Sequence, residues 1–221
     1  MKYKDKYFIF DLDGTLYNFD GESNRGFTSS KFYQKIKQNT TEFINEFIKK
    51  GIIPKDETFD TIKEKSNGEF SLYFENEFGF DRYYFFEKIW NLEPKDFIRK
   101  NPIIKEIFEK LKGRVFILTA APRIWAESVL KYLEVYDIVK NNIISGEPDI
   151  RKPNPLVFQG IINSVDGNAK DFISIGDQEY SDILPAKKLG MKTIIVGQKS
   201  KDADYEIENI DEIIYLLEKL K

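Results

Sequence analysis

Residues 8–16 read FIFDLDGTL, and this stretch decides the fold. Its first three residues are apolar and lead directly into Asp11 and Asp13, which Gly14 follows. A short apolar run that ends at turn residues is typical of a buried strand, so the pattern predicts a strand over residues 7–10 with a tight turn behind it. The paired acids are either caps of that turn or parts of a functional site.

Similar apolar runs recur along the chain, and each predicts a further buried strand, at 115–118, 143–144, 172–175 and 193–196. Amphipathic stretches beside these runs predict helices over 102–111, 122–133, 155–165, 182–189 and 211–220. Strands that alternate with helices indicate an α/β fold, here a Rossmann-like parallel sheet with helices on both faces. Ligands of such sheets bind beyond the carboxyl ends of the strands, where Asp11, Thr119 and Asp177 fall.

The segment 17–99 interrupts this alternation, because it contains no convincing strand and is dense in aromatic residues. Its amphipathic stretches predict helices over 30–50, 55–77 and 82–91. Aromatic residues at helical spacing are more typical of a packed core than of a surface that stacks on a ligand. We therefore expect an all-helical cap domain over 17–99, inserted into an α/β core domain made of 1–16 and 100–221.

The composition excludes several kinds of site. The 221-residue chain has no histidine and no cysteine, which excludes Ser/His and Cys/His catalysis and metal sites built on those residues. Any metal must be held by oxygen ligands, and this favours a hard cation such as Mg²⁺. A net charge of −3 gives no basis for nucleic-acid binding. The apolar run before Asp11 is too short for a signal peptide or a membrane span, so we expect a cytoplasmic protein without a membrane partner.

The two acids of the opening stretch suit phosphoryl transfer. A carboxylate fixed at a strand end is able to attack phosphorus as a nucleophile, and Asp11 is the candidate. Asp13 offers a second carboxyl group, which protonates the leaving oxygen and later takes a proton from water. The plain structural explanation is that both acids cap a turn, which is common at strand ends.

Four segments stand in order along the chain: FDLDGTL at 10–16, FILTAAP at 116–122, RKPNPLVF at 151–158 and ISIGDQEYSD at 173–182. Together they resemble the four motifs of the haloacid dehalogenase superfamily. The resemblance covers the whole predicted core domain, whereas the predicted cap matches only loosely. It implies the α/β fold described above, a helical cap, and phosphotransferase chemistry on a small phosphate ester.

The resemblance also implies roles for individual residues. Thr119 and the backbone at Ala120 would bind a phosphoryl oxygen, although Ala120 lacks the side-chain donor of Asn-containing relatives. Lys152 would offset the negative charge of the nucleophile and the phosphate. Asp182 would support the metal site from outside the coordination shell, by orienting a bound water or Lys152. Without the motif context, Thr119 is explained as a helix cap, Lys152 as a solvated lysine, and Asp182 as an acid at a helix N-terminus.

A divalent cation is expected among these acids. The four motif aspartates would converge with Lys152 as their counter-charge, and carboxylates ~4 Å apart repel by about 4 kcal/mol at an effective dielectric constant of about 20. Mg²⁺ relieves this repulsion, because it prefers octahedral coordination by carboxylates, waters and a substrate phosphate. We assign Asp11, Asp177 and the backbone carbonyl of Asp13 as its direct ligands.

These observations predict a Mg²⁺-dependent phosphomonoesterase that hydrolyses a small phosphorylated metabolite through an aspartyl-phosphate. Asp13 argues against the dehalogenases of the superfamily, which lack a second acid, and against its phosphonatases, which have a small residue there. The absence of histidine argues against a β-phosphoglucomutase. The chain is loosely similar to the phosphoglycolate phosphatase and pyrimidine 5′-nucleotidase branches. The alternatives are a phosphomutase or other phosphotransferase, and a non-catalytic binding or regulatory protein on the same scaffold.

Overall fold

The computed structural model describes residues 5–19 and 27–219. The chain divides into two compact units, one made of Met1–Arg25 with Pro94–Lys221 and the other of Gly26–Glu93. We call them the sheet unit and the helical unit. The helical unit is shorter at both ends than the insertion predicted over 17–99.

The sheet unit is built on six parallel strands in the order β3-β2-β1-β4-β5-β6. The strands are β1 (Tyr7–Phe10), β2 (Val115–Leu118), β3 (Ile143–Ile144), β4 (Phe172–Gly176), β5 (Lys192–Val196) and β6 (Tyr205–Ile207). The order reverses at β1, which pairs with β2 on one side and with β4 on the other. This is the Rossmann-like order, and it confirms the predicted α/β class.

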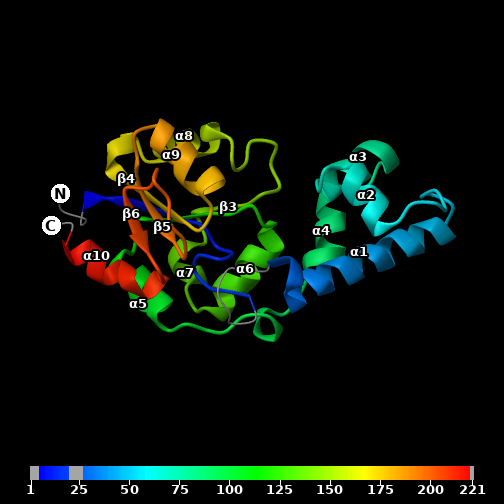
Figure 1. Ribbon diagram of the computed structural model, residues 1–221, viewed down its shortest axis with the longest axis horizontal. Helices are drawn as coiled ribbons and strands as arrows, with labels where there is room; N and C mark the ends of the chain where they lie inside the picture. The colour runs from blue at the N-terminus through cyan, green and yellow to red at the C-terminus, as the bar shows by residue number, and fades with distance from the viewer. Residues whose placement is uncertain (1–4, 20–26, 220–221) are drawn as a thin grey trace. The chain divides into compact units, whose positions relative to one another are not determined.

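Helices cover both faces of this sheet, as predicted (Figure 1). The helices of the sheet unit are α5 (Ile103–Lys110), α6 (Arg123–Tyr132), α7 (Tyr136–Val139), α8 (Pro155–Ser164), α9 (Leu184–Lys188) and α10 (Ile213–Lys219). Successive side chains of β1 point to opposite faces. Ile9 packs with Phe116 and with Phe158 of α8, whereas the ring of Phe10 lies 5.3 Å from that of Phe108 in α5. Apolar burial on both faces therefore fixes the position of β1 and of the residues that follow it.

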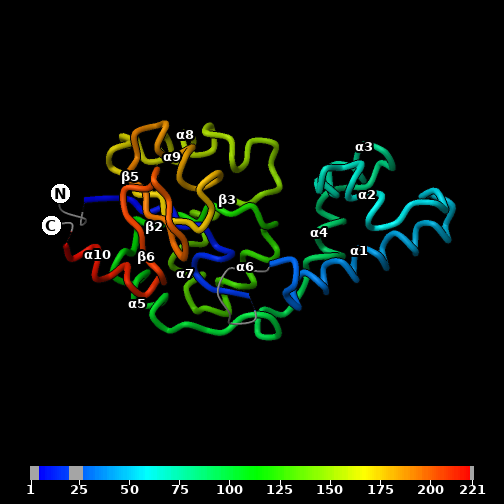
Figure 2. The backbone as a smooth tube through the Cα atoms, viewed as in Figure 1, coloured from blue at the N-terminus to red at the C-terminus, as the bar shows by residue number. Residues whose placement is uncertain are grey.

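The helical unit contains α1 (Lys31–Lys49), α2 (Phe59–Lys65), α3 (Phe70–Phe78) and α4 (Arg82–Trp90). Helix α4 contacts α1, and Figure 2 shows that α4 rises steeply from it, with α2 and α3 completing the unit. The side chains of Ser30, Thr58 and Asp81 accept hydrogen bonds from backbone N–H groups in the first turns of α1, α2 and α4. Such caps satisfy donors that a helix leaves unpaired at its start.

The aromatic residues of the helical unit form its core. Phe43 of α1 lies at the centre, and its ring is 5.4 Å from that of Phe74, 5.2 Å from that of Phe80 and 5.6 Å from that of Phe85. All three pairs meet edge to face, one of the two arrangements that aromatic rings prefer. The dense aromatic set is therefore explained by packing. The role of this unit as a cap stays a prediction.

Some local predictions were wrong. The helix predicted over 55–77 is two helices, α2 and α3, because Asn67 and Gly68 both adopt positive φ between them. The helix predicted over 182–189 instead begins as a π-helix, Glu179–Ile183, that runs into α9. β6 and the short α7 were not predicted. Within residues 5–19 and 27–219, every helix is too short or too polar to cross a lipid bilayer.

Candidate active site

The predicted site residues lie at the carboxyl edge of the sheet, on strands that are neighbours in space. Asp11 directly follows β1, and its backbone N–H donates to the Ile175 carbonyl of β4 at 2.8 Å. Asp177 directly follows β4, and Thr119 directly follows β2. Residues far apart in the chain thus meet at the point where the strand order reverses, the usual ligand site of such sheets.

Lys152 is the centre of the charged cluster. Its Nζ lies 2.5 Å from Asp11 Oδ1 and 2.6 Å from Asp182 Oδ1. All three side chains are almost completely buried, with exposed fractions of 3% for Lys152, 7% for Asp11 and 3% for Asp182. Buried ion pairs persist only when geometry and hydrogen bonding compensate for lost hydration, and here one ammonium bridges two carboxylates. The solvated-lysine explanation of Lys152 is thereby excluded.

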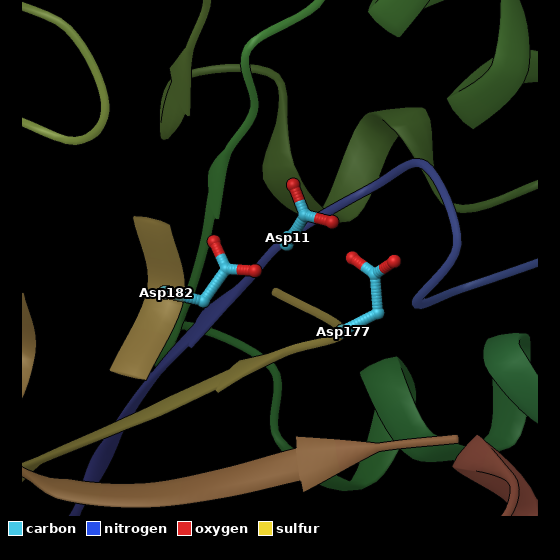
Figure 3. A group of neighbouring side chains, drawn as sticks. All are labelled: Asp11, Asp177 and Asp182. Atoms are coloured by element: carbon cyan, nitrogen blue, oxygen red, sulfur yellow. The ribbon is translucent and has the colours of Figure 1, made fainter. Parts of the chain in front are cut away.

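Asp177 completes a group of three carboxylates. Asp11, Asp177 and Asp182 each offer an oxygen, and these oxygens lie within 4.8 Å of one another. Figure 3 shows the three carboxyl groups turned toward a common centre. Gly14 makes the approach possible, because a Cβ at that position would lie 2.5 Å from Asp177 Oδ2 and because its φ of +82° disfavours other residues. The tight turn of the opening stretch therefore makes room for a carboxylate that comes 163 residues after Gly14 in the chain.

Asp182 is aimed back at the sheet by the π-helix, an irregularity that often marks functional sites. Its Oδ2 accepts from the Gln178 backbone N–H at 3.0 Å, and its Oδ1 accepts from the Ser181 hydroxyl at 3.3 Å. A Cβ at Gly176 would lie 2.2 Å from Asp182 Oδ2, so the glycine leaves room for this carboxylate against β4. With its oxygens engaged by Lys152 and the backbone, Asp182 is suited to orienting the lysine.

Asp13 faces a different set of partners. Its Oδ1 accepts hydrogen bonds from the Tyr17 hydroxyl and from Trp125 Nε1, the latter at 3.0 Å. Its Oδ2 accepts from the Thr119 hydroxyl at 3.4 Å. Asp13 is thus bound by neutral donors, whereas Asp11 is bound by the charged Lys152 and by the Thr15 hydroxyl at 3.0 Å. The two acids of the opening stretch occupy chemically distinct environments.

These environments shift the pKa values of the acids in ways that suit two roles. Burial raises the pKa of Asp13 to about 6, against the opposing hydrogen bond from Tyr17. A carboxyl group with such a pKa is able both to give and to take a proton near neutral pH. Burial alone would lower the pKa of Lys152, but the charges of Asp11 and Asp182 outweigh it and raise this pKa, so the lysine stays cationic.

The loop after β2 lies next to Asp13. Thr119 is buried, and its hydroxyl accepts from the Ala121 backbone N–H at 3.0 Å in addition to its contact with Asp13. Ala120 is exposed, and its carbonyl packs on Gly146, where a Cβ would come within 1.9 Å of that oxygen. The structure thus brings Thr119 to the acids and leaves Ala120 at the accessible side of the loop.

Three residues beside the acids bind them through contacts that were not predicted from the sequence, although Trp125 was considered as a residue on the substrate side. Thr15 binds Asp11, and Tyr17 and Trp125 bind Asp13. Thr15 follows Asp11 by four residues, and Tyr17 follows Asp13 by four. This spacing was a possible signal, because one turn of the chain brings a hydroxyl back to a carboxylate four residues earlier. Trp125 had no such signal, because its contact depends on how α6 docks beside the β1 loop.

The arrangement fits a divalent cation. Asp177 Oδ1 is buried and has no hydrogen-bond partner in the part of the chain that the structure describes. Burial, together with the charges of Asp11 and Asp182, raises the pKa of Asp177 to about 8. A further positive charge would stabilise a carboxylate held in this way, and an all-oxygen ligand set is the kind that Mg²⁺ prefers. Asp11 and Asp177 would hold the ion, with the Asp13 carbonyl as the further ligand that the motif implies.

The reversed strand order and the acidic, lysine-bridged cluster at its switch point define a Rossmann-like α/β enzyme of the phosphate-transfer type. The chain belongs to the haloacid dehalogenase-like hydrolase family, whose model matches residues 6–190. This match confirms the superfamily that the four motifs indicated.

Known proteins share parts of the chain or its fold. It is 29% identical over 101 residues to the glyceraldehyde 3-phosphate phosphatase of Pyrococcus abyssi, a match that covers 44% of this chain and only 42% of that relative. A haloacid dehalogenase-type phosphatase from Thermococcus onnurineus shares the fold with a TM-score of 0.65 and 19% identity, over 96% of this chain and 97% of that one. A family hydrolase from Bacillus subtilis, crystallised with magnesium, shares the fold with a TM-score of 0.58 and 17% identity, over 96% of this chain and 99% of that one.

Proposed function

We propose that the protein is a Mg²⁺-dependent phosphomonoesterase that hydrolyses a small phosphorylated metabolite through an aspartyl-phosphate on Asp11. The observation that carries the proposal is the buried lysine bridge between Asp11 and Asp182, beside an oxygen of Asp177 that has no partner among residues 5–19 and 27–219. A site that concentrates three carboxylates around one lysine is costly to fold, so it needs a function that uses the charges.

In the first proposed step, a carboxylate oxygen of Asp11 attacks the phosphorus of the substrate. The bond between phosphorus and the ester oxygen breaks, and Asp13 gives its proton to that leaving oxygen, so an alcohol departs. Lys152 remains positively charged and offsets the negative charge that gathers on the phosphoryl oxygens. Thr119 and the backbone of its loop would hold one of those oxygens.

In the second step, water attacks the phosphorus of the aspartyl-phosphate. Asp13, now ionised, takes a proton from this water, and the bond between phosphorus and the Asp11 oxygen breaks. Inorganic phosphate leaves, and both acids return to their starting states. Mg²⁺, when bound, would neutralise phosphate charge beside Asp11.

The residues and the relatives support this reaction over its alternatives. The motif residues Asp11, Lys152 and Asp177 are all present and lie together at one edge of the sheet, which weighs against a non-catalytic scaffold. The curated relative from Pyrococcus abyssi is named for its action on glyceraldehyde 3-phosphate, a small phosphate ester. That substrate class is the one we propose here.

The test is phosphate release by the purified chain from a panel of esters, measured with Mg²⁺ and with EDTA. The panel contains glyceraldehyde 3-phosphate, phosphoglycolate, sugar phosphates, nucleoside monophosphates and an aryl phosphate. We expect at least one small ester to be hydrolysed, and only when Mg²⁺ is present. Transfer of the phosphoryl group to an isomer without free phosphate would indicate a mutase. No turnover of any ester would favour a binding protein.

The metal assignment predicts an unusual pH dependence for the metal-free protein. The folded-state pKa of Asp177 is about 8, above its ordinary value of 3.8, so the folded state binds more protons than the unfolded state between these values. Stability without metal therefore falls as the pH rises from about 4 to about 8. Asp177→Asn should remove part of this loss, and at pH 8 without metal it should melt several degrees above the unmutated protein.

Adding Mg²⁺ should reverse the order of the two melting temperatures, so that the unmutated protein melts above Asp177→Asn. The ion should raise the melting temperature of the unmutated protein and leave Asp177→Asn almost unchanged, because the variant lacks a ligand. Asp137→Asn is the matched control, since Asp137 is highly exposed on α7 and pairs with Lys140 at 3.2 Å. Equal stabilisation of all three proteins by Mg²⁺ would contradict the assignment.

A further inference from the structure

Trp125 and Tyr17 form a closed set of hydrogen bonds with Asp13. Trp125 Nε1 lies 3.0 Å from Asp13 Oδ1 and also 3.0 Å from the Tyr17 hydroxyl oxygen, and the Tyr17 hydroxyl in turn bonds to Asp13 Oδ1. An indole N–H is only a donor. The Tyr17 oxygen therefore accepts from Trp125, and its own proton is directed to Asp13.

This set makes the two oxygens of Asp13 unequal. Two donors converge on Oδ1, so that oxygen serves as an acceptor and has little room to carry a proton of its own. Oδ2 has the longer contact of 3.4 Å with the Thr119 hydroxyl, on the side of the loop proposed to bind phosphate. The hydrogen bonds alone thus select Oδ2 as the oxygen that carries the transferable proton.

Rigid surroundings hold both donors. Trp125 lies on α6 with no exposed surface, and its ring centre is 6.5 Å from those of Phe19 and Phe97. Tyr17 is buried and meets Phe19 edge to face at 5.3 Å. The backbone N–H of Gly14 also donates to the Tyr17 carbonyl at 3.0 Å, which closes the loop that carries Asp13.

We propose that Tyr17 and Trp125 are a positioning pair, which orients Asp13 so that Oδ2 exchanges protons with the leaving group and with water. The inference rests on the proposed function and assigns to it two residues outside the four motifs. Neither residue needs to touch the substrate. The competing explanation is that Asp13 merely satisfies the polar atoms of two buried aromatic side chains.

The variants Tyr17→Phe and Trp125→Phe distinguish these explanations. Each removes one donor and keeps an aromatic ring. The readout is kcat/KM for two substrates, an alkyl phosphate whose leaving alcohol needs a proton and p-nitrophenyl phosphate whose leaving group does not. The value of kcat/KM covers the steps up to formation of the aspartyl-phosphate, so it reports on proton donation to the leaving group.

We expect kcat/KM for the alkyl phosphate to fall about 10-fold or more in each variant, and that for p-nitrophenyl phosphate to change about threefold at most. Water attack also needs Asp13, so p-nitrophenolate should appear as a burst equal to the enzyme concentration, followed by slow turnover. A merely structural role produces neither the difference between the two substrates nor the burst. Equal losses on both substrates without a burst would overturn the proposal, and so would unchanged kinetics.

Two controls keep the result interpretable. Phe97→Leu alters the packing on Trp125 without removing a hydrogen bond to Asp13, and it should lower both kcat/KM values alike, if at all. If Trp125→Phe fails to fold, Tyr17→Phe alone carries the test, because it deletes one hydroxyl. Failure of the proposed function is distinguishable from failure of the positioning pair, because the unmutated protein itself would then hydrolyse neither ester with Mg²⁺.

Discussion

Asp11→Asn should reduce phosphate release by roughly 10⁴-fold or more, with little loss of folding. The amide has nearly the same shape as the carboxylate, and it keeps an oxygen for the 3.0 Å bond from the Thr15 hydroxyl or the 2.5 Å contact with Lys152 Nζ. It is, however, too weak a nucleophile to attack phosphorus. The measurement is steady-state release of phosphate from the best ester of the panel, together with the melting temperature.

A covalent readout makes this test independent of rate. The unmutated protein, quenched in acid during turnover of a labelled ester, should carry phosphate on Asp11, and Asp11→Asn should carry none. Asp137→Asn serves again as the control, because its change in charge is the same and its side chain lies at the surface. Turnover within tenfold of normal in Asp11→Asn would show that another group attacks the phosphorus.

Lys152→Met should cost both stability and activity. Methionine nearly matches the length of the lysine but leaves Asp11 and Asp182 buried without their shared cation. Removing one partner of a buried ion pair typically destabilises a protein by about 3 kcal/mol or more. In a domain of this size such a loss lowers the melting temperature by about 10 °C. Turnover should fall about 100-fold or more, because the charge that offsets the phosphoryl oxygens is lost.

Lys192→Met is the matched comparison for stability. Lys192 pairs with Asp204 at 2.8 Å, but its side chain is 46% exposed, and exposed ion pairs contribute about 1 kcal/mol or less. Urea unfolding of both variants, at a pH where the acids are ionised, gives the comparison directly. Equal effects of the two substitutions would mean that the buried bridge contributes no more than a surface pair.

The parts of the fold that the sequence predicted are those with a local signal. β1, β2 and β5 are apolar runs, and the paired acids, Lys152 and Asp177 stand in recognisable motifs. Their convergence also followed from the sequence, since parallel strands bring their carboxyl ends to one edge. The strand order of the sheet then explains why Asp11 and Asp177 are neighbours.

The remaining features depend on contacts that have no local signal. The bond from Trp125 to Asp13 joins residues that are 112 positions apart, and an indole on an apolar helix face looks like any core residue. β6 has the sequence Tyr-Glu-Ile, whose strand character comes from pairing with β5. The π-helix at Asp182 accompanies a contact of its carboxylate with Lys152, 30 positions away in the chain, which periodicity does not reveal.

Every predicted site residue from Asp11 to Asp182 belongs to the sheet unit, although the helical unit is inserted between the first motif and the other three. The residues proposed to carry the reaction and the residues of the helical unit are therefore encoded in separate stretches of the chain. Substitutions or whole exchanges within Gly26–Glu93 replace none of the residues of the lysine bridge, so the helical unit is able to vary in a lineage while those residues stay the same.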